Sequence, residues 1–117
     1  MAIIEVRDRG LERWELIKPI LHYTKEGELL YIPKGFVTDF ATVPPVLRWF
    51  FPPLADDKLA FIVHDYLYTI GRTEEDRREA DLEMQHVQRS LGASVLRYTL
   101  MFWGVRIFGR PYFEKKG

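Results

Sequence analysis

The most chemically suggestive stretch of this sequence is Ala60–Tyr68, where an imidazole and a carboxylate, His64 and Asp65, are adjacent among apolar residues. If the stretch is helical, the two side chains point about 100° apart and serve different sub-sites. The imidazole suits proton transfer, and the carboxylate suits a hard divalent cation such as Ca²⁺. Tyr68 lies one turn after His64 and shares its face. His64 and Tyr68 are therefore candidate catalytic residues, and Asp65 is a candidate metal ligand.

A second carboxylate, Asp81, is predicted to face His64 from the next helix. His64 lies seven residues before Gly71, and Asp81 lies eight residues after Thr73. Helices joined by so tight a turn run antiparallel, which brings residues at similar distances from the bend together. An aspartate that accepts the Nδ1 proton would leave Nε2 to activate a water for hydrolysis.

The same contact has a structural interpretation. A buried His–Asp hydrogen bond can fix the register of two helices without any catalysis. Solvent access separates the two interpretations. A catalytic histidine needs a ring nitrogen that water can reach, whereas a structural histidine can be fully buried.

A third polar group, Thr38, Asp39 and Thr42, lies in a proline-bounded loop. Such short side chains either bond backbone donors or supply oxygen ligands. With the latter role, Asp39 would join Asp65 in a site for Ca²⁺ or another divalent cation.

The remaining histidines and a group of arginines are predicted to lie outside this site. His22 falls in an expected strand, and His86 lies about 140° around the helix from Asp81. The arginines near the acidic start of that helix are expected to be ion-pairing surface residues: Arg72, Arg77 and Arg78.

Patterning predicts the elements that position these residues, strands first and helices after. Residues 14–32 predict a β-hairpin with its turn at 25–28, and residues 33–53 form an aromatic, proline-rich loop with a short helix at 45–50. Three helices follow: from Asp56 or Asp57 to Ile70, from Thr73 to Gly92, and from Ser94 to Phe108. The last is expected to turn Leu100, Met101, Gly104, Val105 and Phe108 one way and Arg106 and Arg110 the other. The fold class is α+β: the hairpin and loop pack on three helices, the first two an antiparallel pair, in a single domain over residues 1–117.

Composition narrows the functional classes. The 117 residues are 47% hydrophobic, which suffices for one packed core. Seventeen basic residues balance seventeen acidic ones, so no nucleic-acid partner is expected from bulk charge. The absence of cysteine excludes disulfides and thiolate chemistry. No apolar run predicts a signal peptide or a transmembrane segment, so the expected location is cytoplasmic.

Charge is unevenly distributed, with consequences for partners. Residues 56–83 carry four basic and nine acidic side chains, whereas residues 84–117 carry six basic and one acidic. The C-terminal aromatic and basic segment is expected to pack its apolar face into the core; a docking surface or a lipid interface is the alternative.

Four motifs in order carry a resemblance that covers residues 14–112. They are Gly35–Pro44 (GFVTDFATVP), His64–Tyr68 (HDYLY), Arg78–Asp81 (READ) and Gly104–Gly109 (GVRIFG). This pattern resembles a small family of phage- and prophage-encoded proteins of unknown function. The resemblance implies a viral origin, a location in the host cytoplasm or the virion, and other phage proteins as partners.

A partial resemblance concerns the site itself. Over residues 59–88, the helix pair is similar to the catalytic helix pair of phospholipases A2. That resemblance implies His64 as the base that activates water, Asp65 as the calcium ligand and Asp81 as the residue that orients the imidazole. Two functional classes therefore stay open: a small hydrolase, and a noncatalytic virion component or accessory binding protein in which the same residues form a structural network.

Overall fold

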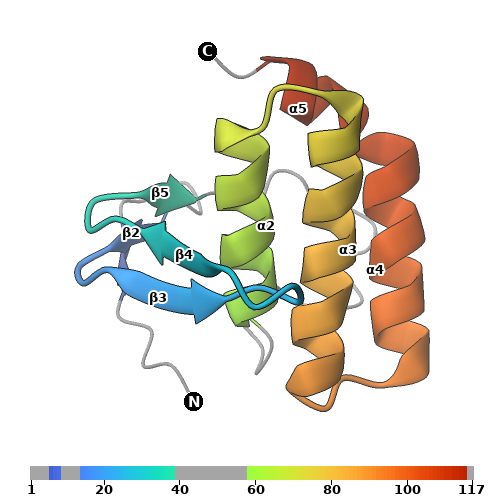
Figure 1. Cartoon of the computed structure of the whole chain (residues 1–117), viewed down its shortest axis with the longest axis horizontal. Helices are drawn as coiled ribbons and strands as arrows, with labels where there is room; N and C mark the ends of the chain where they lie inside the picture. Colours follow the sequence, from blue (N-terminus) through green and yellow to red (C-terminus); the bar gives the residue numbers. More distant parts are fainter. Residues whose placement is uncertain (1–5, 9–13, 39–57, 116–117) are drawn as a thin grey trace. The chain divides into compact units, whose positions relative to one another are not determined.

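The computed structural model describes residues 6–8, 14–38 and 58–115 (Figure 1). The chain divides into two compact units, Met1–Asp39 and Phe40–Gly117. The described part of the first unit is built of strands and that of the second of helices, which confirms the α+β class. That the two units fold as a single domain stays a prediction.

The β unit contains the predicted hairpin, which begins at Ile20 rather than at Trp14, and a second small sheet to which Trp14–Leu16 belongs. The hairpin pairs β3 (Ile20–Tyr23) with β4 (Leu29–Ile32), and the other sheet has the antiparallel order β1 (Val6–Asp8), β2 (Trp14–Leu16), β5 (Val37–Thr38). The hairpin closes where the Thr24 amide donates to the Glu28 carbonyl at 2.8 Å. Sequence patterning does not predict β1 and β5, because strands of two or three residues are too short to show a period of two.

The hairpin has one buried and one exposed face. Ile20 and Ile32 lie opposite each other and are buried, as a period-two pattern requires. The exposed face carries the two alternate cross-strand pairs, Leu21 with Tyr31 and Tyr23 with Leu29.

The helical unit contains α2 (Lys58–Ile70), α3 (Glu74–Ser90), α4 (Val95–Phe108) and α5 (Arg110–Lys115). Helix α3 lies between α2 and α4, and α5 contacts the ends of α2 and α4 (Figure 1). The predicted antiparallel pair, α2 and α3, is present. The buried apolar residues of this pair include Ala60, Ile62, Val63, Ala80, Met84 and Val87, and two polar residues of α3, Glu83 and Gln88, are buried as well.

Local caps set the helix boundaries close to where the sequence predicts them. The Thr73 hydroxyl accepts from the Asp76 amide at 3.0 Å, and the Asp76 carboxylate accepts from the Thr73 amide at 3.1 Å. This reciprocal capping box satisfies two of the amide donors that a helix start leaves open. Ser94 caps α4 in the simpler way, through the Arg97 amide at 3.2 Å.

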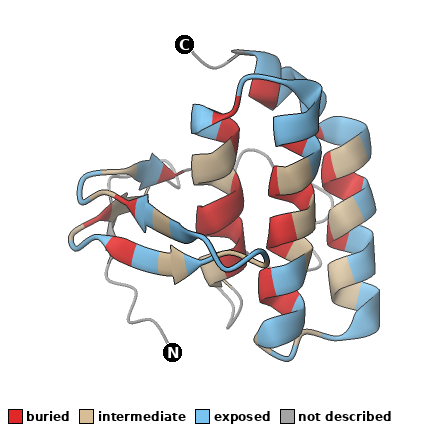
Figure 2. Cartoon of the chain, viewed as in Figure 1, coloured by how far each residue is buried: buried red, intermediate tan, exposed pale blue. Residues whose placement is uncertain are grey.

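Two predictions about the helices need correction. Helix α5 makes four helices in the described residues rather than three, because Gly109 stays in the right-handed helical region (φ −79°, ψ −19°) and its carbonyl accepts the Tyr112 and Phe113 amides. In α4, Leu100 and Phe108 are exposed, so only part of the predicted apolar face is buried (Figure 2). The expected caps Asp56 and Asp57 and the short helix at 45–50 lie outside the described residues.

None of the helices described by the structure combines the length and the apolar character needed to cross a bilayer.

Candidate functional site

The predicted contact between α2 and α3 is present at the centre of their seam. His64 Nε2 lies 2.6 Å from Asp81 Oδ1, and both side chains are 0% exposed. The nitrogen involved is Nε2, however, and not the predicted Nδ1. Nε2 is the ring atom farthest from the backbone, so it is the one that reaches across to a partner helix. Because neutral imidazole carries one donor and one acceptor nitrogen, a proton shared with Asp81 makes Nδ1 the acceptor.

Tyr68 joins the same carboxylate oxygen. Its hydroxyl donates to Asp81 Oδ1 at 2.8 Å, and its ring lies against the His64 imidazole with centroids 4.1 Å apart. Burial, and secondly the charge of Asp81, raise the pKa of the Tyr68 phenol above its ordinary value. Tyr68 is therefore a permanent donor to Asp81 across the ordinary pH range.

Arg77 is buried, at 2% exposed, which corrects its predicted surface position; Arg72 and Arg78 are exposed as expected. Its Nη1 donates to the Tyr68 hydroxyl at 3.2 Å and to the Val105 carbonyl at 3.1 Å. Its Nη2 donates to the Arg106 carbonyl at 3.3 Å. The two carbonyls belong to the last turn of α4. The Val105 carbonyl also accepts the Gly109 amide at 2.9 Å, so Arg77 adds a second bond there and serves as a side-chain cap of α4.

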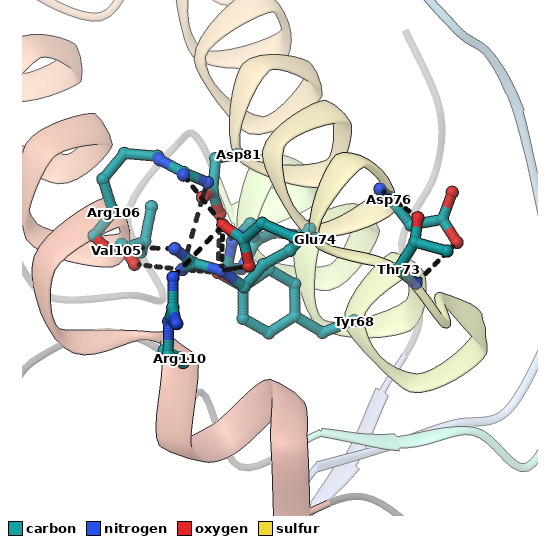
Figure 3. A network of polar contacts seen from close by, with 10 residues as sticks. Tyr68, Thr73, Glu74, Asp76, Asp81, Val105, Arg106 and Arg110 are labelled. Carbon is teal, nitrogen blue, oxygen red and sulfur yellow. Dashed lines mark hydrogen bonds and ion pairs between the residues drawn. The ribbon is translucent and has the colours of Figure 1, made fainter.

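Arg106 and Glu74 complete the network (Figure 3). Arg106 Nη1 donates to Asp81 Oδ2 at 2.8 Å, and Arg106 Nη2 donates to Glu74 Oε1 at 3.0 Å. Arg77 Nε donates to Glu74 Oε2 at 2.9 Å. The bond from Arg77, opposed by burial and supported by the bond from Arg106, lowers the pKa of Glu74 to about 2. Arg110 Nη2 also lies 3.8 Å from Glu74 Oε1 at the exposed edge of the network, so two carboxylates pair with three guanidiniums.

Gly109 marks a close approach between α2 and the end of α4. A Cβ at this position would lie 2.7 Å from the Tyr68 hydroxyl oxygen and 2.4 Å from the Val105 carbonyl oxygen. Only glycine allows the two elements to approach this closely. Three residues of the GVRIFG motif thus serve the site. Val105 provides a carbonyl that Arg77 bonds, Arg106 bonds Asp81, and Gly109 leaves room for the Tyr68 hydroxyl.

The proposed cation ligands are not brought together in the described part of the chain. Asp65 is partly buried on α2, and its backbone carbonyl accepts from the Thr69 hydroxyl at 2.9 Å. Asp39 lies outside the described residues. Over residues 6–8, 14–38 and 58–115 no group of three His, Asp or Glu side chains is arranged to hold a metal ion. A cation site at Asp65 and Asp39 stays a prediction.

Sequence reasoning missed Glu74, Arg77 and Arg106 as members of the site. Helical spacing offers a signal for two of them, because Arg77 lies four residues before Asp81 and Glu74 three before Arg77, on one face. No local signal reveals Arg106, which reaches Asp81 from 25 residues away.

The fold and the site together define an α+β protein whose three longer helices are joined by a buried histidine–aspartate–arginine network. The chain belongs to the family described as "Protein of unknown function (DUF1353)", which matches residues 14–105. No curated protein and no solved structure matches the chain.

Proposed function

We propose that this protein is a noncatalytic structural or binding component encoded by phages or prophages, in which the buried network fixes the arrangement of its helices. One observation carries the proposal: His64 and Asp81 are both 0% exposed while donors from two neighbouring helices, α2 and α4, occupy the carboxylate. The phage or prophage origin is supported by the resemblance of the four sequence motifs.

The pattern of bonds suits a structural role. Asp81 Oδ1 accepts from two groups of α2, and Asp81 Oδ2 accepts from Arg106 of α4. A buried carboxylate is costly unless its lone pairs are satisfied, and here partners from two neighbouring helices satisfy them. Removing any one partner would leave a buried polar group unpaired, so the network favours one arrangement of α2, α3 and α4.

A hydrolase is the second candidate, favoured by the 2.6 Å contact between His64 and Asp81. In this candidate Asp81 orients the imidazole, Tyr68 supports the same carboxylate oxygen, and Nδ1 accepts the proton of an attacking water. Asp65 and Asp39 would bind Ca²⁺ or another divalent cation beside it. The candidate requires that water reach Nδ1, whereas the noncatalytic role does not.

Comparing His64→Ala with His86→Ala tests the proposal, since His86 is an exposed histidine of α3. A structural network predicts that His64→Ala lowers the free energy of unfolding by about 1–3 kcal/mol because Asp81 loses a buried donor. His86→Ala should change it by less than about 0.5 kcal/mol.

The same proteins are then assayed for ester hydrolysis on phosphatidylcholine vesicles with and without Ca²⁺. We expect no turnover by wild type. Calcium-dependent turnover that His64→Ala and Asp65→Asn both abolish, with an unchanged thermal transition, would overturn the noncatalytic proposal and establish the hydrolase.

A further inference from the structure

Helix α4 carries a row of large apolar side chains on its solvent side. Leu96, Leu100, Trp103 and Ile107 are 64%, 39%, 58% and 65% exposed. Their spacing of four, three and four residues places them within about 60° of one another around the helix. We call these four residues the α4 stripe; it runs for about 16 Å along the helix.

The opposite face of α4 is already used, because Met101, Gly104 and Val105 are buried. A helix that is apolar on both faces is typical of one that is covered on both sides. Phe108 and Tyr112, which follow the stripe along the chain, are exposed as well. A row of exposed large apolar side chains on one helix face marks an interaction site, and the alternation of three and four residues is the spacing with which one helix packs on another.

We infer that the α4 stripe is a homodimer interface, in which the α4 helices of two copies of this chain pack antiparallel. The stripe is symmetric about its midpoint, between Leu100 and Trp103. A two-fold axis through that point places Leu96 of each copy against Ile107 of the other, and Leu100 against Trp103. Such a surface is complementary to itself and closes as a dimer.

Charge does not oppose a second copy. The charged residues of α4 are Arg97 and Arg106, and the helix contains no acidic residue. In an antiparallel pair, each side of one helix faces the same side of the other helix, which runs in the opposite direction. Arg97 therefore lies beside Gly104 of the other copy, and Arg106 lies beside its Thr99. No like charges are opposed in this arrangement.

An anionic lipid surface fits this face less well. Arg106 is already bonded to Asp81 and Glu74, and the Arg97 guanidinium lies 5.8 Å from the Phe61 ring centroid. The stripe is narrow, whereas a helix that lies in a membrane interface has a broad apolar face and free cations along its polar one.

The inference rests on the proposed binding role, but its variants leave Asp81 and its partners unchanged. Analytical ultracentrifugation of the full chain should show a monomer–dimer equilibrium. Trp103→Glu should raise the dissociation constant at least tenfold with unchanged far-ultraviolet circular dichroism. Leu21→Glu is the matched control, because Leu21 is equally exposed on β3 but lies outside the stripe.

The cysteine-free chain also permits a test of direction. Under mild oxidation, the double variant Leu96→Cys/Ile107→Cys should form a covalent dimer, and the single variant Leu96→Cys should not. A dimer linked through Leu96→Cys alone would overturn the antiparallel arrangement. A wild type that stays monomeric, or Trp103→Glu that dimerises like wild type, would overturn the interface. Wild-type monomers that bind phosphatidylglycerol vesicles, with binding lost in Trp103→Glu, would assign the stripe to lipid instead. None of these outcomes depends on the His64→Ala comparison, so the two proposals fail separately.

Discussion

Replacing Asp81 by asparagine is the most informative single change, because it keeps the shape of the side chain and removes its charge. The carboxylate accepts bonds from His64 and Tyr68 on one oxygen and from Arg106 on the other. An asparagine has one acceptor oxygen, so its amide nitrogen must face donors on one of the two sides. If the oxygen stays toward α2, the amide nitrogen meets the Arg106 guanidinium.

The expected cost follows from the bonds that are lost. One charge-assisted hydrogen bond contributes about 1.5–3 kcal/mol, and a donor facing a donor adds to that loss. We expect Asp81→Asn to lower the free energy of unfolding by about 2–4 kcal/mol. Asp81→Ala should cost about 3–5 kcal/mol, because it removes the acceptor of His64, Tyr68 and Arg106 at once.

Urea unfolding followed by circular dichroism measures both variants. Glu75→Gln is the matched control: it removes an acidic charge from α3 at an exposed position whose partner, Arg78, is 3.8 Å away. It should change the free energy of unfolding by less than about 0.5 kcal/mol. In thermal melts, Asp81→Asn should lose roughly 4 °C per kcal/mol for a chain of this length. If Asp81→Asn is as stable as Glu75→Gln, the network is not what joins the helices and our reasoning is refuted.

Three further predictions concern neighbouring features. Gly109→Ala should cost about 1–3 kcal/mol through crowding, and Tyr68→Phe should relieve part of that cost because it removes the oxygen 2.7 Å from the new Cβ; full additivity in a double-mutant cycle would contradict the close approach. Glu74 has its pKa lowered from 4.5 to about 2, so its stabilisation is complete above pH 4.5 and is lost as the pH falls through about 2. Glu74→Gln should therefore lower the free energy of unfolding by about 1 kcal/mol at pH 7, a value kept small because Glu74 is exposed. This difference from wild type should shrink as the pH falls, and a difference that grows would contradict the prediction. Thr73→Ala should cost about 1 kcal/mol by thermal or urea unfolding, and no change would mean that the capping box does not hold the start of α3.

The features that sequence predicted well are those set by local chemistry. Thr73 and Ser94 cap their helices where the sequence predicts, because each contacts an amide only three residues away. The turn of the hairpin lies at residues 25–28 as expected, with Gly27 at a positive φ of 82°. The His64–Asp81 contact was also predictable, since a short turn leaves an antiparallel helix pair little freedom of register.

The features that the sequence did not predict depend on contacts between residues that are far apart along the chain. Arg77 looks like a surface residue by its local acidic surroundings, but it is buried where two carbonyls at the end of α4 accept its bonds. Helix α5 follows α4 because Gly109 keeps a helical conformation where glycine more often ends a helix. The choice of Nε2 over Nδ1 follows from the separation of two helices, which spacing along one chain does not specify.

The two proposals meet in the orientation of α4. Because this helix is apolar on both faces, hydrophobic burial alone would not select which face packs on α3, since that attraction has no direction. Hydrogen bonds do have direction. Arg106 must reach Asp81, and the carbonyls at the end of α4 must meet Arg77, so the helix cannot rotate about its axis without leaving buried charges unpaired. The network thereby turns Met101 inward and Trp103 outward, and a substitution that breaks it should disturb dimerisation without touching the α4 stripe.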